Sequence, residues 1–349
     1  MSITYKEMLE TFNALEKTKN YLEVNWLKIE DFIKSVDRYV FVGCGSSYSN
    51  AKSFAMICSI STGVPALALA AGDILLHAKR YRKCIDGAAV VFISRSGRTS
   101  ELIKAHGRLR DIGCSIMVAS LVCADDTPLG DKSDLVLSTP WAFDESVCQT
   151  RCVTNAYFMA AYIAAKITNN TSVLFDLQSV ITKGSAYLKK MEAFACELAG
   201  QPWKHAVILA DAELEGIAEE GALVFKEVCR LPSSYHHLLD VRHGPMVLIN
   251  NETLVLAALG TSCELEKALL YDLKVKGACV VAFSNIFTVP PAYTTDFDDI
   301  IHLSFDEPLS HIAKGIPFIV LCQMVAYYKS KETGADPDKP EGLDPWIAL

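Results

Sequence analysis

Short runs of consecutive apolar residues recur along the chain, and segments with helical spacing of apolar and polar residues separate them. In the first half these runs lie at residues 39–42, 66–69, 88–93, 115–119 and 135–137. Runs of this length without polar interruption are typical of strands that are buried on both faces of a parallel sheet. Helices are predicted at about residues 49–61 and 100–112, each after one of these strands. The first half therefore predicts a parallel sheet that is covered by helices.

The same pattern returns in the second half. Apolar runs predict strands at residues 205–210, 253–258, 279–283 and 300–303. Helical spacing predicts helices at residues 214–229, 264–276 and 309–331, and longer helical stretches at residues 5–37 and about 150–200. Two similar alternations in one chain indicate an internal structural duplication, although little of the sequence itself is repeated.

The pattern predicts an α/β protein with two domains, each a doubly wound, mainly parallel sheet flanked by helices. A chain of 349 residues is long for one such domain and comfortable for two of about 150 residues each. We expect N-terminal helices at residues 1–35, a first domain at 36–175, a helical linker at 176–200, a second domain at 201–333 and a C-terminal tail at 334–349.

Composition narrows the classes of function. The formal net charge of −8 disfavours a nucleic-acid-binding surface or an anionic-membrane surface, because both need clustered positive charge. The N-terminus has no signal-peptide pattern, and no apolar run reaches the roughly 18 residues of a membrane span. The 12 cysteines include no C-x-x-C pair, so free thiols in a reducing compartment explain them better than disulfides or zinc. We therefore expect a cytoplasmic protein without a cofactor or a metal.

Two loops rich in glycine and serine follow strands of the first domain, where a doubly wound sheet binds its ligands. Residues 43–47 (GCGSS) follow one strand and residues 94–99 (SRSGRT) follow another. Glycine lets the backbone turn its N–H groups toward an anion, and the next helix adds partial positive charge at its N-terminus. A helix cap or a turn explains either loop alone, but the two loops together, on neighbouring strands, favour an anion site. The candidate phosphate contacts are Gly45, Ser46, Ser47, Ser94, Arg95, Ser96, Gly97 and Thr99.

A dinucleotide site is the main alternative for these loops. The first loop lacks a full G-x-G-x-x-G, because Ser46, Ser47 and Tyr48 follow its second glycine. No acidic residue directly closes the next strand at Leu69, and a Walker loop is absent as well. The nicotinamide interpretation is therefore weak.

The two loops resemble the phosphate-binding loops of the sugar isomerase (SIS) domain family. Three further segments resemble family motifs in the same order, namely residues 145–151 (ESVCQTR), 220–227 (EGALVFKE) and 242–245 (RHGP). The resemblance covers almost the whole chain. It is strongest to the isomerase half of glucosamine-6-phosphate synthase, to stand-alone amino-sugar-phosphate isomerase/deaminases and to fructosamine-6-phosphate deglycases. It implies two tandem SIS domains, a sugar-phosphate substrate, and a homodimer with shared active sites or a higher homo-oligomer.

The resemblance also implies roles for single residues. Glu227 falls where the family has the general base that moves a proton between C1 and C2 of the open-chain sugar. His243 falls where the family has a histidine that opens the ring or protonates an oxygen, and in relatives a neighbouring subunit can supply it. Glu220 lies seven residues before Glu227 on the same helix face and is a third candidate, although an isolated pair of this kind is most often a surface pair. Gln149 and Thr150 are further candidate substrate contacts.

Two departures from the family limit the choice of reaction. Val224 replaces the first lysine of the family's E-G-A-L-K-L-K-E helix. No lysine follows Lys339, whereas the synthase has a C-terminal lysine that forms an imine with the ketose. The chain also begins at Met1 without a glutaminase domain before it. We therefore expect a substrate that already carries nitrogen, rather than glutamine-dependent synthesis.

Three functions remain open. The first is isomerisation of an amino-sugar 6-phosphate with release of ammonia, and the second is cleavage of a fructosamine 6-phosphate by a deglycase. Residues 346–349 (WIAL) differ from the aromatic-acidic-Tyr tail of the deglycases and favour the isomerase/deaminase. The third, a non-catalytic sugar-phosphate sensor, is disfavoured because residues 1–35 are too short and too acidic for a DNA-binding helix-turn-helix. His236 and His237 suggest a metal only weakly, since adjacent histidines point apart and no third ligand is evident.

Overall fold

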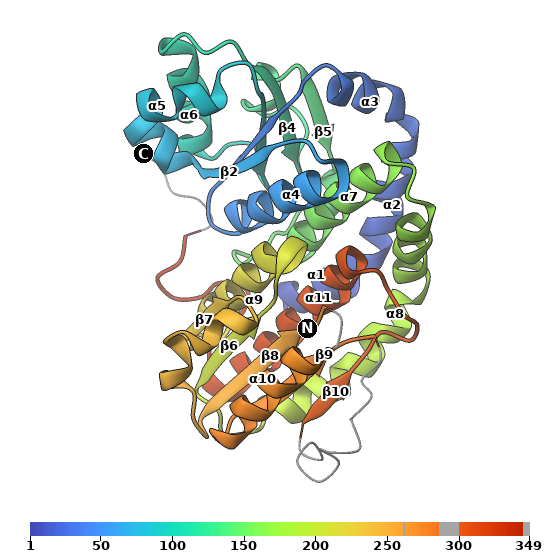
Figure 1. The fold of residues 1–349 in the computed structure, drawn as a ribbon, viewed down its shortest axis with the longest axis vertical. Coiled ribbons are helices and arrows are strands. Elements are labelled where there is room, and N and C mark those ends of the chain that lie inside the picture. Colours follow the sequence, from blue (N-terminus) through green and yellow to red (C-terminus); the bar gives the residue numbers. More distant parts are fainter. Residues whose placement is uncertain (261–262, 286–299, 345–349) are drawn as a thin grey trace.

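Each half of the molecule is built on one parallel sheet of five strands. The computed structural model describes residues 1–260, 263–285 and 300–344, and Figure 1 shows the two halves stacked along the long axis. The first sheet has the order β2-β1-β3-β4-β5 and consists of β1 (Tyr39–Gly43), β2 (Ala66–Ala70), β3 (Ala89–Ser94), β4 (Met117–Val122) and β5 (Leu135–Ser138). The second sheet has the order β10-β9-β8-β6-β7 and consists of β6 (His205–Leu209), β7 (Ser233–His236), β8 (Thr253–Ala258), β9 (Cys279–Phe283) and β10 (Ile301–Leu303).

The two sheets share one topology. In each, the first strand along the chain lies between the second and the third, so β1 pairs with β2 and β3, and β6 pairs with β7 and β8. The predicted α/β class with two parallel sheets is confirmed. This order places a switch point between β1 and β3 and another between β6 and β8, where crevices open beyond the carboxyl ends of the strands.

Helices cover both faces of each sheet (Figure 1). On the first sheet, α4 (Ser46–Thr62) and α7 (Arg151–Ile167) pack on the face toward the second half, and α5 (Ala71–Ile85) and α6 (Ser100–Asp111) pack on the outer face. On the second sheet, α9 (Glu215–Val228) and α11 (His311–Thr333) pack on the face toward the first half, and α10 (Glu264–Val275) packs on the outer face. The middle of the molecule is therefore a layer of helices from both halves.

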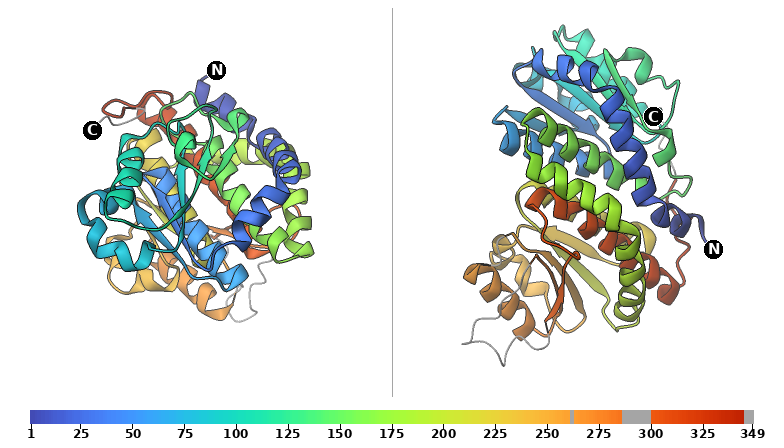
Figure 2. Two further views of the ribbon diagram at one scale, coloured as in Figure 1. Left: turned by 90° about the horizontal axis from the view of Figure 1, so that it is seen from above. Right: turned by 90° about the vertical axis from the view of Figure 1, so that its right-hand side faces the viewer.

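The remaining helices join the two halves along one side. The N-terminal helices are α1 (Ile3–Leu9), α2 (Thr11–Val24) and α3 (Trp26–Lys34), and Figure 2 shows them running along one flank of the molecule. The long helix α8 (Thr171–Ala199) packs along α11 and against α2. The domain boundaries that the sequence suggested stay a prediction.

One continuous apolar core spans both halves. It contains inner-face side chains of both sheets, such as Phe41 and Phe283, together with side chains of the central helices, such as Phe158, Phe225 and Phe318. Burial of a side chain of this size contributes about 1.5–3 kcal/mol. The shared core therefore fixes the two halves against each other.

The two halves come closest where α9 crosses α4. A Cβ atom at Gly216 would lie 2.1 Å from the Ser49 carbonyl oxygen and 2.6 Å from the Ser53 hydroxyl, closer than real atoms approach. Only glycine therefore allows α9 to lie this near to α4. The contact places Glu220, one helical turn after Gly216, beside the first turn of α4.

The predicted strands of both halves are present. The structure also contains a strand, β7, and a helix, α5, that were not predicted. Residues 346–349, on which the preference for a deaminase over a deglycase partly rested, lie outside the described residues. Within the described ranges, no helix combines the length and the apolar character needed to cross a membrane.

Candidate active site

The two predicted phosphate loops lie side by side at the switch point of the first sheet. Strand β1 pairs with β3 in parallel, so the loops at 43–47 and 94–99 leave adjacent strand ends. Each loop leads into a helix, the first into α4 and the second into α6. Gly45 and Gly97 have φ angles of 54° and 61°, a region that favours glycine. The loops thus bring two helix N-termini to one edge of the sheet.

The loop at 94–99 is held by its own hydroxyl groups. The Ser94 hydroxyl accepts a hydrogen bond from the Gly97 N–H (3.1 Å) and lies 3.0 Å from the Thr99 hydroxyl. The Ser96 hydroxyl accepts from the Arg98 N–H at 3.2 Å. Ser94 is buried, whereas Ser96 is partly exposed. Ser94 and Thr99 therefore shape the loop, and the partly exposed Ser96 has only a local contact.

Arg95 holds the neighbouring loop at residues 144–147. Its Nη1 atom donates to the backbone carbonyls of Asp144 (3.2 Å), Ser146 (2.6 Å) and Val147 (3.3 Å). Its guanidinium carbon lies 5.7 Å from the centre of the Phe143 ring. The predicted phosphate contact of Arg95 stays a prediction, and in this structure the side chain fastens a loop.

Glu227 is a partly buried carboxyl on α9 near this loop. Burial raises its pKa to about 7, while the charge of Arg95 and the nearby Cys148 thiol act in the opposite direction. Cys148 itself is 1% exposed. A carboxyl that titrates near neutral pH is well matched to taking a proton from a substrate and returning it.

Glu220 is buried more deeply on the same helix. It is 1% exposed, and neither carboxyl oxygen makes a well-formed hydrogen bond within the described structure. Burial raises its pKa well above the usual value, and the charge of Glu227 raises it further, while the nearby Ser46 and Ser49 hydroxyls lower it. Glu220 therefore stays protonated at a pH at which Glu227 ionises.

Gln149 and Thr150 lie directly before α7. The Gln149 side-chain oxygen accepts a hydrogen bond from the Cys152 thiol at 3.1 Å, and the Thr150 N–H donates to Asp144 at 2.8 Å. The Thr150 hydroxyl is buried without a hydrogen-bond partner in the described part of the chain. A cavity of about 20 Å³, lined by Ser47, Ser94, Arg95 and Gln149 among others, lies between the loops. This is room for about one water molecule, so the cavity does not hold a sugar.

A known domain family matches part of the first half of the chain. Residues 32–166, which contain both loops, match the SIS domain family. The matched segment is an SIS domain. Its relatives extend the similarity over nearly the whole chain.

Glutamine–fructose-6-phosphate aminotransferase (isomerizing) from Pyrobaculum aerophilum is 26% identical over 97% of this chain, which covers 56% of that protein. The protein of the same name from Escherichia coli is 22% identical over 97% of this chain, which covers 57% of it. The chain thus spans about half the length of the curated relatives it matches.

Solved structures share the fold of the whole chain beyond the SIS domain. Glucosamine-6-phosphate deaminase from Thermotoga maritima has a TM-score of 0.80 and 24% identity, with all of both chains covered. Tagatose-6-phosphate ketose/aldose isomerase from Escherichia coli has a TM-score of 0.84 and 20% identity, with 99% of this chain and 97% of that chain covered. Likeness at these identities is a likeness of fold.

His243 lies away from the SIS-domain loops and from Glu227. It is exposed, and its N–H donates to the Asp240 carbonyl at 2.8 Å. The preceding Arg242 pairs with Asp272 on α10 at 2.6 Å, on the outer face of the second sheet. No described contact joins His243 to Glu220 or Glu227, so its predicted role as an acid depends on a second copy of the chain.

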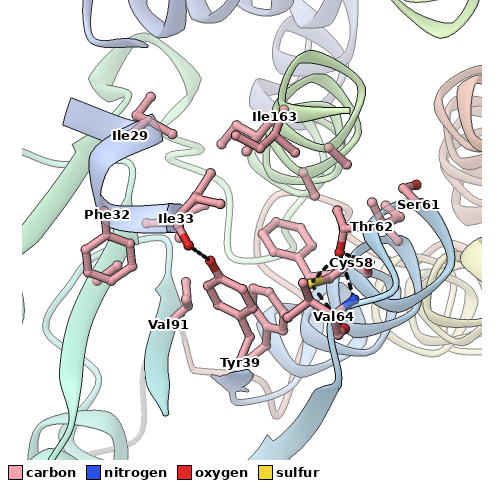
Figure 3. A pocket seen from close by; sticks show the side chains of 18 of the residues that line it. Ile29, Phe32, Ile33, Tyr39, Cys58, Ser61, Thr62, Val64, Val91 and Ile163 are labelled. Atoms are coloured by element: carbon pink, nitrogen blue, oxygen red, sulfur yellow. Dashed lines mark hydrogen bonds between the residues drawn. The ribbon is translucent and has the colours of Figure 1, made fainter. Parts of the chain in front are cut away.

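An apolar cavity lies inside the SIS domain but away from this chemistry. It has a volume of about 330 Å³ and lies between the first sheet, α3, α4 and α7 (Figure 3). Its lining is apolar, with Ile29, Phe32 and Ile163 among the contributing side chains, and the Tyr39 hydroxyl donates to the Ile33 carbonyl at 2.9 Å. No carboxyl, amino or imidazole group lines it. The cavity is therefore not the place for acid–base catalysis, despite its size.

The adjacent histidines do not form a metal site. His237 lies 3.1 Å from an Asp211 oxygen, and His236 lies 3.2 Å from the Ser234 hydroxyl. Among the residues described, no three His, Cys, Asp or Glu side chains are arranged to hold a metal ion.

The sequence did not reveal the contacts made by Arg95 and Cys148. Arg95 lies in a motif that suggests phosphate binding, and nothing in that motif shows that its guanidinium reaches carbonyls about 50 residues later. Cys148 resembles the other buried thiols of the chain. Both residues lie within segments that resemble the family, but the contacts of Arg95 depend on the course of the loop at 144–147, and the position of Cys148 near Glu227 depends on the packing of α9 against the first half.

Proposed function

We propose that this protein is a phosphosugar isomerase that acts on an amino-sugar 6-phosphate and releases ammonia. One observation carries the proposal: the pKa of Glu227, which burial brings to about 7, is affected by the charge of Arg95, a residue in one of the two hydroxyl-rich loops at the switch point of an SIS domain. The names of the curated relatives, which refer to fructose 6-phosphate and to isomerisation, agree with this substrate class. The same strand order in both sheets supports a second SIS domain in the second half.

The phosphate would bind at the loops. Their backbone N–H groups, the N-termini of α4 and α6 and the Ser96 hydroxyl offer donors to its oxygens. The net charge of the chain is −8, so the electric field of the whole protein repels a phosphate. These local donors have to overcome that repulsion.

Glu227 would perform the proton transfers. In its ionised form it removes the C2 proton of the open-chain 2-amino aldehyde, the electrons form a C1–C2 double bond, and the aldehyde oxygen is protonated. Return of the proton from Glu227 to C1 leaves an imine at C2. Water then hydrolyses this imine to the ketose phosphate and ammonia. No step needs an oxidant, a reductant or a metal.

A second copy of the chain would supply His243 as the acid. Val247 and Leu248, which follow this exposed histidine, are 80% and 68% exposed. Exposed apolar side chains beside a functional group favour a surface that associates with another copy. A homodimer with shared sites therefore belongs to the proposal.

The test is an assay panel on the purified chain. Glucosamine 6-phosphate, galactosamine 6-phosphate and several fructosamine 6-phosphates are incubated with the protein, and ammonia, free amine and hexose phosphate are measured. Ammonia from an amino-sugar phosphate supports the proposal, and its loss in Glu227→Gln assigns the base. Free amine with glucose 6-phosphate identifies a deglycase instead. Binding without turnover identifies a sugar-phosphate sensor.

A further inference from the structure

A buried carboxyl on the N-terminal helix contacts the loop that lies against Glu227. Glu7 on α1 is 4% exposed. One of its oxygens accepts the backbone N–H groups of Glu145 (2.6 Å) and Ser146 (3.2 Å), and its other oxygen is hydrogen-bonded to the Ser146 hydroxyl. A carboxyl that accepts consecutive backbone N–H groups fixes the direction of that backbone.

The contacts continue from this loop to the candidate base. The Ser146 hydroxyl lies 2.8 Å from the Cys148 carbonyl oxygen. The Cys148 thiol, in turn, lies near the Glu227 carboxyl and lowers its pKa. Glu7, Ser146, Cys148 and Glu227 therefore form one continuous chain of contacts from the first helix of the protein to α9.

The hydrogen of the Ser146 hydroxyl can be donated to only one of its two neighbours, and this determines the hydrogen bonds along the chain of contacts. A hydroxyl has one hydrogen, so it can donate to Glu7 or to the Cys148 carbonyl but not to both. Burial and the nearby Asp144 raise the pKa of Glu7. A protonated Glu7 donates to the Ser146 oxygen, which leaves the Ser146 hydrogen for the Cys148 carbonyl. A glutamine at position 7 offers the same donor and the same acceptor.

The position of Glu7 is itself fixed by the C-terminal segment. Asp338 accepts the N–H groups of Ile3 (2.9 Å) and Thr4 (2.8 Å), the first residues of α1. The Asp338 carbonyl also accepts the Val147 N–H at 3.0 Å. The loop at 144–147 is thus held by α1, by Asp338 and by Arg95, and each contact is a hydrogen bond to its backbone.

We infer that Glu7 is a positioning residue for Glu227 and acts through Ser146 and Cys148. The inference rests on the proposed function, because it takes Glu227 as the base. Glu7 has no described hydrogen bond to either phosphate loop, so we expect it to affect the proton transfer more than the binding of the phosphate.

The experiment compares Glu7→Ala, Glu7→Gln and the matched control Glu16→Ala, which removes an exposed carboxyl from α2. Glu7→Ala leaves the buried N–H group of Ser146 and the partly buried N–H group of Glu145 without their acceptor and frees the loop. We expect kcat to fall about 10- to 100-fold, because a displacement of about 1 Å at a catalytic group has this effect, with KM within about threefold. Glu7→Gln and Glu16→Ala keep kcat within about threefold of the wild type, since Glu7→Gln preserves the contacts.

Alkylation of Cys148, followed by peptide mass spectrometry, gives a readout that does not depend on activity. We expect iodoacetamide to label Cys148 about 10-fold faster in Glu7→Ala than in the wild type, because the loop opens locally. If the wild type has no activity on any substrate, the proposed function has failed and the labelling still tests the position of the loop. Unchanged labelling together with unchanged kcat overturns the inference. So does an equal loss of kcat in Glu7→Ala and Glu7→Gln.

Ser146→Ala provides a second variant if Glu7→Ala does not fold. It removes the hydroxyl between Glu7 and Cys148 and keeps both backbone hydrogen bonds of Glu7. A lower kcat at unchanged KM, with faster labelling of Cys148, supports the inference. A wild-type kcat in Ser146→Ala overturns the part played by this hydroxyl and, with it, the route from Glu7 to Glu227.

Discussion

The carboxyls of Glu220 and Glu227 lie two helical turns apart on α9, and the charge on Glu227 raises the pKa of Glu220. Burial raises the pKa of both carboxyls, but Arg95 and the Cys148 thiol lower the pKa of Glu227 alone. The two groups therefore ionise in a fixed order. Glu227 becomes the base, and Glu220 stays neutral beneath it.

The rate should follow the ionisation of Glu227. A base has to be deprotonated, so kcat/KM should rise with pH and level off above about 7, the pKa of this carboxyl. Glu227→Gln should lower turnover by about 10²- to 10⁴-fold, the usual contribution of a general base, while glucosamine 6-phosphate still binds. A pH–rate profile and calorimetric titrations of both proteins measure this. Full turnover in the variant would remove Glu227 from the mechanism.

Glu220→Gln should stabilise the protein at neutral and alkaline pH. The folded protein keeps a proton on Glu220 above its ordinary pKa of 4.5, whereas the unfolded chain has lost it. The free energy of unfolding therefore falls as the pH rises above that value toward the folded pKa. Glutamine carries no charge to bury, so we expect a gain of about 1–3 kcal/mol at pH 8 and a flatter dependence on pH. Urea denaturation at pH 5 and pH 8 measures it, with Glu16→Gln as the exposed control. A less stable Glu220→Gln at pH 8 would contradict the burial argument.

Removal of Arg95 should move the pH dependence of the reaction upward. Its positive charge lowers the pKa of Glu227, so Arg95→Met should shift the rise in kcat/KM to higher pH. Arg95→Lys keeps the charge and loses most of the contacts to the carbonyls of residues 144–147. A shift in the methionine variant alone indicates an electrostatic effect, and equal shifts in both variants indicate an effect of the loop.

Ser96→Ala should weaken the binding of a sugar phosphate. Ser96 is partly exposed, and the contact of its hydroxyl with the Arg98 N–H is local. Loss of one hydrogen bond of about 1 kcal/mol predicts a Kd about fivefold higher for glucosamine 6-phosphate, with kcat little changed. Calorimetry at fixed salt measures the binding. An unchanged Kd would place the phosphate away from this hydroxyl.

Gly216→Ala should destabilise the protein strongly. The new methyl group would lie 2.1 Å from the Ser49 carbonyl, so α9 and α4 have to separate. We expect a loss of about 1–3 kcal/mol or more, together with a loss of turnover as Glu227 moves. Gly107→Ala on α6 is the control, since nothing lies within 4 Å of its added methyl group. That variant should gain about 0.5–1 kcal/mol. Thermal unfolding distinguishes the two.

Much of the fold could be predicted because its strands are buried on both faces. The run at 253–258 coincides with β8, and the run at 279–283 coincides with β9. Strand β7 (Ser233–His236) was not predicted because it has no apolar run. It is a polar strand at the edge of the sheet and is only partly buried. Helix α5 was not predicted because charged and apolar side chains are mixed along it and its backbone is interrupted at His77.

The candidate site could be predicted only in part. The loops at 43–47 and 94–99 follow adjacent strands, as their pattern suggested. The partners of Glu227 come from segments far apart in the sequence, and no local pattern indicates that Arg95 or Cys148 faces it. The role of His243 and the phosphate contacts stay predictions, because the acid depends on a second copy and the phosphate on a bound substrate.

The bond between Thr4 and Asp338 joins positions that are 334 residues apart. A ribosome makes α1 before either sheet, and the acceptor for the N–H groups of Ile3 and Thr4 emerges only after both sheets have been synthesised. A nascent chain can therefore build its two sheets while the loop at 144–147 still lacks one of its anchors. Full turnover should be reached only after residue 338 has left the exit tunnel, so a ribosome-bound chain that ends before this residue should be less active.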